Sequence, residues 1–152
     1  QFGNYELKNA RCFLKSNGIS EIGINIICKA ISEISFKGTK ECIPSTLEGR
    51  IVQDADRLDS IGAIGIARTF TYGGSIGRKI YIPEILPKSF QSNIEYKDYV
   101  GTTINHFYEK LLNLKNDMNT EAGKKIALEK HIFMETFLEK FFDEWECGEI
   151  ND

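Results

Sequence analysis

Apolar residues recur along the chain at spacings of three and four, the repeat of a helix with one buried face. The repeat covers a first segment from Tyr5 to Asn17 and a second from Ser20 to about Ile34. Gly18 stands between them, in the position where helices commonly stop. Residues 36–44 lack the repeat and are predicted to form a loop. The first part of the chain therefore predicts two short helices.

The longest apolar pattern runs from Leu47 to Phe70 and predicts a third helix. Ser45 and Glu48 before it have the spacing of a capping box, in which each side chain satisfies a free backbone N–H of the first turn. Residues 60–67 are small or apolar all round the helix. We expect this half of the helix to be buried on every side.

Residues 71–98 contain Gly, Pro and polar residues in place of a helical pattern. We predict a long loop here, and loops of this length within a domain usually carry function. A fourth helix is predicted from Tyr99 to Leu114, and a fifth runs from a cap at Asn119 or Thr120 to about Trp145. Because no alternating strand pattern is present, the sequence predicts an all-α bundle of about five helices with one long loop.

Composition adds limits on the partner. A chain of 152 residues suits one domain, and we treat residues 1–152 as such. The net charge of −3 argues against a general nucleic-acid binder, which carries a basic face. No apolar run reaches the ~18 residues of a membrane span. Cys12 and Cys28 fall among apolar residues and are expected to fill the core. We expect a cytoplasmic protein that binds a small molecule and neither nucleic-acid polymers nor membranes.

Three carboxylates lie within six residues of the third helix. Asp54 is within helical reach of Arg50 and Arg57, so a structural ion pair explains it. Asp56 and Asp59 are neighbours on one face, with no Lys or Arg three or four positions away. Two adjacent anions repel each other unless a cation neutralises them, and Mg²⁺ and Mn²⁺ prefer carboxylate oxygens. The pattern favours a metal site, and a solvated charged surface is the alternative.

The sequence around these carboxylates resembles a known family. Residues 53–59 (QDADRLD), 61–70 and 72–74 closely resemble bacterial HD-domain phosphohydrolases, and residues 105–111 and 118–120 are similar to the same subgroup. The resemblance covers nearly the whole chain. It implies an HD-domain-like helical fold that hydrolyses phosphoester or phosphoanhydride bonds of a phosphorylated small molecule, typically a nucleotide, with Mn²⁺ or Mg²⁺.

The resemblance also implies roles for individual residues. The family holds its metal with a histidine, an adjacent His-Asp pair and a separate downstream Asp. The Ala-Asp-Arg context matches that last ligand to Asp56, with Asp59 as the second choice and Asp54 as the third. Arg57 is predicted to support Asp56 as a second catalytic residue.

The sequence departs from the family pattern upstream of Asp56. The two histidines, His106 and His131, both follow it, and neither precedes an Asp. The first residue is Gln1. We expect the segment with the other three ligands to be missing from this sequence, and this chain alone to be inactive. The alternative is a non-catalytic helical binding module that has lost its metal site. His131 is interpreted as structural, and His106 as a core or surface histidine, with substrate contact as the alternative.

The glycine-rich stretch after the third helix is the candidate for phosphate binding. Glycines let backbone N–H groups approach an anion, and the neighbouring cations can hold phosphate oxygens. The stretch follows a helix and does not open one, so it is not a P-loop. The predicted substrate-binding residues are Arg68, Tyr72, Gly73, Gly74, Arg78 and Lys79. A solvated loop is the alternative.

Overall fold

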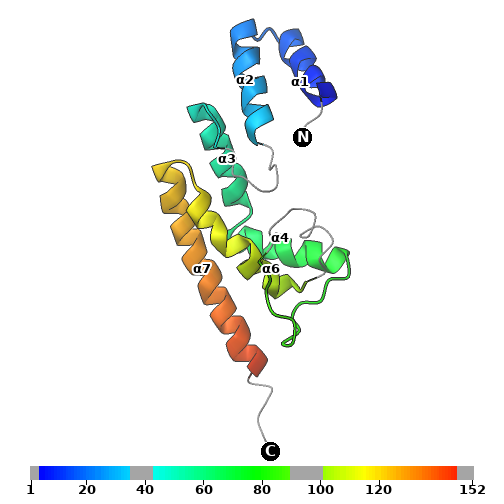
Figure 1. Cartoon of the computed structure of the whole chain (residues 1–152), viewed down its shortest axis with the longest axis vertical. Helices are drawn as coiled ribbons and strands as arrows, with labels where there is room; N and C mark the ends of the chain where they lie inside the picture. The colour runs from blue at the N-terminus through cyan, green and yellow to red at the C-terminus, as the bar shows by residue number, and fades with distance from the viewer. Residues whose placement is uncertain (1–3, 35–42, 90–100, 147–152) are drawn as a thin grey trace, which may run out of the picture.

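The computed structural model describes residues 4–34, 43–89 and 101–146, and within them it is helical and contains no strand (Figure 1). The prediction of an all-α fold is therefore confirmed. The helices are α1 (Asn4–Ser16), α2 (Glu21–Ile34), α3 (Leu47–Asp59), α4 (Gly62–Ser75), α6 (Thr103–Glu109), the 3-10 helix η1 (Leu111–Asp117) and α7 (Glu121–Glu146). None of the helices in these ranges is long and apolar enough to cross a bilayer.

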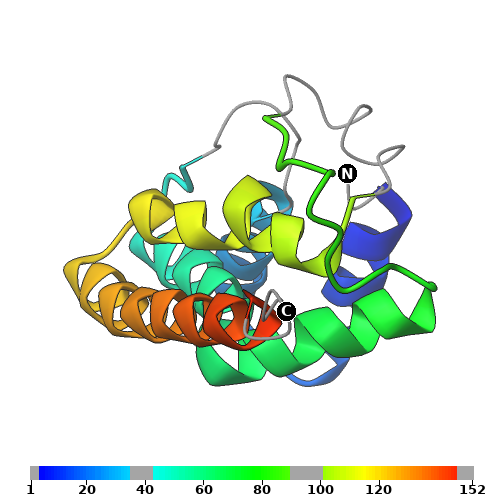
Figure 2. The ribbon, with the colours of Figure 1, turned by 90° about the horizontal axis from the view of Figure 1, so that it is seen from below.

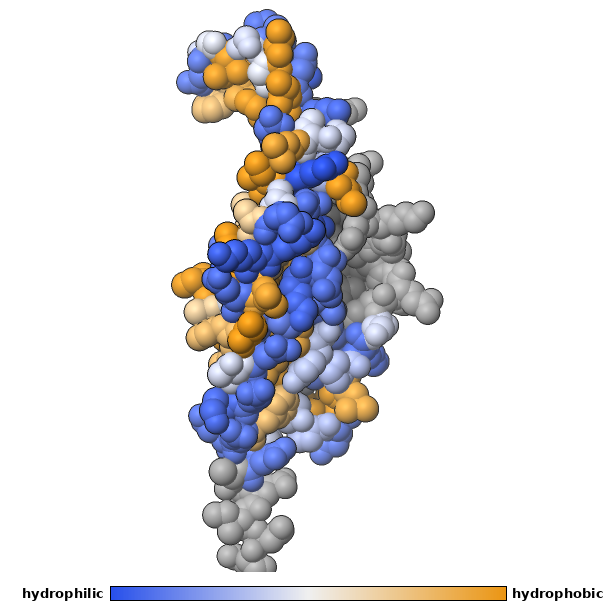
Figure 3. Space-filling model, turned by 90° about the vertical axis from the view of Figure 1, so that its left-hand side faces the viewer, coloured by the Kyte–Doolittle hydropathy of each residue, from blue (hydrophilic) through white to orange (hydrophobic). Residues whose placement is uncertain are grey.

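The helices form an elongated molecule with a hairpin at one end. Helices α1 and α2 make the hairpin, and α2 packs on α3 (Figure 1). Helix α7 runs beside α3 and α4 and also contacts η1. Seen along the long axis, α4 and α7 lie side by side, with α6 on top of them (Figure 2). The hairpin exposes large apolar side chains, among them Phe13 and Ile22, and orange surface gathers there at the top of Figure 3.

The buried core lies in the body of the molecule, where α4, α6, η1 and α7 meet. Its fully buried members include Ile61, Ile104, Phe107 and Met134. Burying such a side chain stabilises the fold by about 1.5–3 kcal/mol. The Phe107 ring also stacks on that of Phe137 at 5.9 Å between centroids. This core fixes α6 against α4 and α7.

The cysteines divide between core and surface. Cys28 is buried in α2, as predicted, whereas Cys12 is exposed on α1, so the prediction that it fills the core is wrong. Helix α1 contacts α2 alone among the larger helix contacts, and its outer face has no neighbour to cover Cys12 within the described ranges. Cys42 and Cys147 lie outside the described residues.

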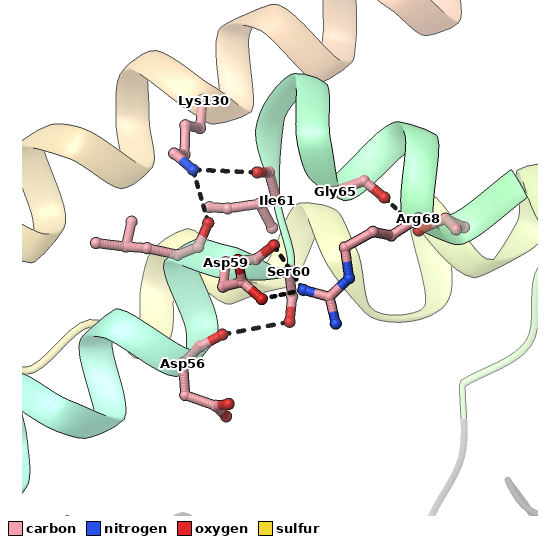
Figure 4. Close-up of polar contacts among 9 residues, drawn as sticks. Asp56, Asp59, Ser60, Ile61, Gly65, Arg68 and Lys130 are labelled. Carbon is pink, nitrogen blue, oxygen red and sulfur yellow. Dashed lines mark hydrogen bonds and ion pairs between the residues drawn. The ribbon is translucent and has the colours of Figure 1, made fainter. Parts of the chain in front are cut away.

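The predicted continuous helix over residues 47–70 is wrong, because the chain breaks between α3 and α4. Ile61 is extended and fully buried, and Gly62 has a φ of 77°, a conformation that favours glycine. Lys130 of α7 donates from its Nζ to the carbonyls of Leu58 (2.8 Å) and Ile61 (3.3 Å). These bonds tie α7 to the break between α3 and α4 (Figure 4).

The start of α3 also differs from the prediction. Thr46 is the N-cap, and its Oγ1 accepts a hydrogen bond from the Gly49 N–H at 3.1 Å. Ser45 instead donates from its backbone N–H and its hydroxyl to Glu33 of α2, each at 2.9 Å. The predicted capping box between Ser45 and Glu48 is therefore wrong, because Ser45 ties α3 to α2.

The last two predicted helices are recovered with changed bounds. Residues 103–117 form α6 and η1, which meet at Lys110, and the start predicted at Tyr99 lies outside the described residues. Thr120 accepts a hydrogen bond from the Gly123 N–H at 3.0 Å, so Thr120 is the cap of α7. Helix α7 then runs to Glu146, close to the predicted end.

Candidate functional site

Asp54 on α3 is a structural anchor for α7. It is 3% exposed, and its Oδ1 accepts hydrogen bonds from the backbone N–H and the side-chain amide of Asn119 at 2.7 and 2.9 Å. Its Oδ2 accepts from the backbone N–H and the hydroxyl of Thr120 at 2.8 and 2.7 Å. Burial by itself raises the pKa of Asp54, but these bonds outweigh it and hold the pKa below its ordinary value of 3.8.

The predicted ion pair of Asp54 with Arg50 and Arg57 is wrong. Arg50 donates from its Nε to the Pro44 carbonyl at 2.9 Å, and Arg57 donates to the Asp117 carbonyl. Both arginines therefore fasten α3 to neighbouring backbone. The helix spacing places both arginines near Asp54. It does not show that Asn119 and Thr120, just before and at the cap of α7, donate hydrogen bonds to both carboxylate oxygens of Asp54.

Asp59 pairs with a cation that the sequence pattern does not place beside it. A guanidinium nitrogen of Arg68 donates to the Asp59 carboxylate and, at 3.3 Å, to its backbone carbonyl (Figure 4). Both side chains are more than half exposed. Arg68 lies nine residues away, too far for a pair along one helix, and the break before α4 brings it back. Asp59 is therefore neutralised within the chain.

Asp56 presents its carboxylate to solvent on α3. Within the described residues this carboxylate has no hydrogen bond or ion pair, and in Figure 4 it points away from the Asp59–Arg68 pair. The Asp56 backbone carbonyl accepts a hydrogen bond from the Ser60 hydroxyl at 3.3 Å. No group of three or more His, Cys, Asp and Glu side chains that could hold a metal occurs in the described ranges. These residues alone do not fit a complete metal site, and Asp56 could supply one ligand.

A cleft of about 780 Å³ lies between α4 and α6, within the usual size range of ligand pockets. Three of the predicted substrate-binding residues, Arg68, Tyr72 and Arg78, line it. Ser60, one turn after Asp56, lines it as well. The cleft is thus lined by cations from α4 and from the segment that follows it.

The end of α4 explains how Arg78 reaches the cleft. The predicted loop over residues 71–98 begins later than expected, because α4 continues to Ser75; residues 90–98 lie outside the described ranges. Gly77 has a φ of 69° and donates to the Gly74 carbonyl at 3.1 Å, and the Arg78 N–H donates to the Gly73 carbonyl at 2.8 Å. This pair of bonds is a Schellman motif, which ends the helix and turns the chain back.

The other predicted substrate-binding residues lie outside the cleft lining. Gly73 is buried in α4, where a Cβ would come within 2.6 Å of the Thr103 hydroxyl, so its small size allows α4 and α6 to pack closely. Gly74 is exposed on the same helix. Lys79 is exposed, and its backbone carbonyl accepts the Thr103 N–H at 2.9 Å. A substrate contact by these three residues stays a prediction.

Three ionisable residues of the cleft, on α6 or at its end, were not among the predicted site residues. His106 on α6 and Lys110 at its end line the cleft together with Glu109. Burial, followed by the charges of Lys110 and Arg78, lowers the pKa of His106 to about 4. The imidazole is therefore neutral at pH 7. His106 and Lys110 are four residues apart, and this helical spacing was the signal available in the sequence.

The apolar start of α4 forms part of the cleft wall. Ile61, Gly62, Gly65 and Ile66 are buried, as predicted. Ile64 is 64% exposed, and with the exposed Ala67 it lines the cleft. The prediction that this segment is buried on every side is therefore wrong, because its outer face is open to the cleft in the described structure.

Comparison with proteins of known structure identifies the family. A Lactobacillus plantarum protein is 37% identical, with a TM-score of 0.77, and the match covers 96% of this chain and 70% of that one. A Bacillus thuringiensis HD-superfamily hydrolase is 38% identical, with a TM-score of 0.73, and the match covers 95% of this chain and 68% of that one. The chain belongs to the HD superfamily. No family model matches it.

A further relative is the uncharacterized protein YpgQ of Bacillus subtilis. It is 36% identical over 123 residues, which make up 80% of this chain and 52% of YpgQ, so the chain spans about half the length of this curated relative. The structure of YpgQ in complex with ADP matches with a TM-score of 0.70 and 29% identity, over 95% of this chain and 64% of that one. The expected resemblance to HD-domain proteins is thus confirmed at the level of the superfamily and its helical fold.

Proposed function

We propose that this protein is part of a metal-dependent phosphohydrolase that cleaves a phosphoester or phosphoanhydride bond of a nucleotide. The observation that carries the proposal is the cleft between α4 and α6, in which Arg68, Arg78 and Lys110 gather within an HD-superfamily fold. Three cations at one cleft suit the phosphate groups of a nucleotide, because charge-assisted hydrogen bonds to phosphate are strong.

The relatives support the nature of the reaction and of the ligand. The Bacillus thuringiensis relative is described as a hydrolase, and the YpgQ structure contains ADP. HD proteins usually depend on a metal, and Mn²⁺ or Mg²⁺ would favour the carboxylate of Asp56. The remaining ligands would have to come from outside the described residues. The inactivity expected of this chain alone stays a prediction, as does a supporting role for Arg57 beside Asp56.

In this scheme the residues of the chain bind and orient the substrate. Arg78 and Lys110 hold phosphate oxygens at the α6 side of the cleft. Arg68, which is paired with Asp59, presents its guanidinium at the α4 side. Tyr72 is 62% exposed on the cleft rim, where its ring offers a stacking face for a nucleobase. The metal, when bound, would lower the pKa of a water molecule and screen phosphate charge.

The test compares two adjacent cations, of which only one lines the cleft. In the native protein with Mn²⁺ and several nucleoside triphosphates, Arg78→Ala should lower kcat/KM by about 10- to 100-fold, because charged contacts to phosphate contribute about 1.5–3 kcal/mol. Lys79→Ala, the matched control, should lower it by less than about threefold. Steady-state kinetics would measure both, and removal of metal with EDTA should abolish turnover in every variant.

Two outcomes would contradict the proposal in different ways. If Arg78→Ala and the unmodified protein had equal kcat/KM, the cleft would not be the substrate-binding site. Tight nucleotide binding without turnover, in the native protein supplied with Mn²⁺ or Mg²⁺, would instead identify a non-catalytic helical binding module. Calorimetric titration with a nucleotide, run beside the hydrolysis assay, separates the two outcomes.

A further inference from the structure

The α6 side of the cleft holds a buried donor without an acceptor. The Nε of Arg78 is buried and has no hydrogen-bond partner within the described part of the chain. Its backbone is fixed by the Schellman motif that ends α4, and the next residues are tied to the first N–H groups of α6. A buried N–H without a partner destabilises the fold. Arg78 also lines the cleft, where its positive charge can attract an anion.

The same side of the cleft combines a neutral imidazole with positive charge. Burial, together with the charges of Lys110 and Arg78, keeps the His106 ring neutral at pH 7, and all three residues line the cleft. Of the other charged groups on the cleft, Arg68 is paired with Asp59, and Glu109 accepts the backbone N–H of Lys88 at 3.2 Å. Within the described residues, the charges that act on the imidazole are those of Lys110 and Arg78, and a bound dianion would act against them.

We propose that Arg78, His106 and Lys110 form a subsite for a dianionic phosphate group, and that His106 takes up one proton from solvent when the dianion binds. The proton adds to the unprotonated ring nitrogen, and no other bond forms or breaks. The protonated imidazole then becomes a third cation at the subsite. The proposal rests on the proposed function in one respect only, namely that the phosphate group belongs to a nucleotide.

Proton uptake makes the affinity of the subsite depend on pH. Without ligand, the pKa of His106 is about 4. A bound dianion stabilises the charged ring and raises this pKa. Affinity for the anion must then rise as the pH falls from 8 towards the lower pKa. If the bound pKa returns to the ordinary value of about 6.5, affinity at pH 5.5 is about tenfold that at pH 8.

The experiment uses inorganic sulfate, which stays a dianion over this pH range, whereas phosphate groups themselves titrate. NMR of the imidazole protons of the 152-residue chain, with and without saturating sulfate, gives the pKa of each ring. Only two histidines are present, so the His131 signal serves as an internal control. We expect sulfate to raise the pKa of His106 by two units or more, while the His131 signal at each pH stays where it is without sulfate.

The matched variant is His106→Gln, which keeps a polar side chain and removes the titration. Calorimetric titrations at pH 5.5 and pH 8 should show about a tenfold change in sulfate affinity for the unmodified chain and less than twofold for the variant. A pH dependence that persists in His106→Gln overturns proton uptake by His106, and an absence of sulfate binding overturns the subsite. Neither measurement needs turnover, so a protein that binds sulfate in this way but hydrolyses no nucleotide refutes the proposed function alone.

Discussion

Two aspartates that stand two residues apart on α3 occupy opposite settings. Asp54 is buried and accepts four hydrogen bonds from Asn119 and Thr120. Asp56 is exposed, and within the described ranges its carboxylate has no partner. Burial of a charge is costly unless hydrogen bonds compensate it, and at Asp54 they do so fully. Asp54 is thus committed to the fold, and Asp56 is free to act on something outside it.

The comparison shows that a carboxylate's role depends on its face of the helix and not on its motif alone. The three aspartates share one short sequence, and by resemblance each was a candidate metal ligand. The fold removes Asp54 by burying it and satisfies Asp59 with Arg68. Of the three, Asp56 is the aspartate whose carboxylate, within the described residues, has no partner and can bind a metal. The following substitutions test this division.

The largest effect is expected from Asp56→Ala in the active protein. If Asp56 is a metal ligand, kcat/KM should fall about a thousandfold or more, because both the metal and the water it activates lose their position. The fold should survive, since the side chain is exposed and makes no contact that stabilises it within the described residues. Kinetics with saturating Mn²⁺ and thermal unfolding measure the two quantities. Near-normal turnover would rule out Asp56 as a ligand.

The second effect concerns stability. Asp54→Ala should lower the free energy of unfolding by about 3 kcal/mol, because it leaves buried donors of Asn119 and Thr120 without an acceptor at the start of α7. Urea unfolding followed by circular dichroism measures it. Asp56→Ala should leave the free energy of unfolding nearly unchanged. If Asp54→Ala lowered it by less than about 0.5 kcal/mol, the two faces of α3 would not differ as described.

The third effect is a pH dependence of that stability. The pKa of Asp54 in the folded chain lies below its ordinary 3.8, so folding favours the charged form. The contribution is fully present above about pH 3.8 and is lost as the pH falls through the lower folded pKa. The difference in unfolding free energy between the unmodified chain and Asp54→Asn should therefore shrink between pH 5 and pH 2.5. A constant difference over this interval would contradict the charged network.

The smallest effect is expected at the third aspartate. Asp59→Asn removes the pair with Arg68, but both side chains are more than half exposed and solvent screens the interaction. We expect a loss of about 0.5 kcal/mol or less. In the active protein the freed Arg68 should still reach the cleft, so KM for a nucleotide should change less than about threefold. A loss of activity as large as that of Asp56→Ala would make Asp59 the ligand instead.

Periodicity predicted the helical class and most helix positions, because each helix of the body buries one regular face. It missed the break after Asp59, since Ile61 and Gly62 continue an apolar pattern without a proline. The break depends on a positive φ at Gly62 and on the Lys130 ammonium, which comes from a helix about 70 residues later. A pattern read along one segment contains no information about such a partner.

The candidate site was predictable in part for the same reason. Arg68, Tyr72 and Arg78 could be chosen from the sequence because charge and aromatic character beside glycines mark a ligand-binding stretch, and all three line the cleft. His106 and Lys110 come from a helix that is distant in sequence. Only the packing of α6 against α4, with Gly73 close to Thr103, places them on the same cleft.

The sequence by itself determined the all-α class, the family and the short motif that carries three aspartates, because these follow from local spacing and residue identity. The tertiary structure decided which aspartate is buried, which is paired and which is open. It also decided which cations meet at the cleft. The physical reason is that hydrogen-bond partners and charge neighbours 9 to 66 residues apart become adjacent only when the helices pack.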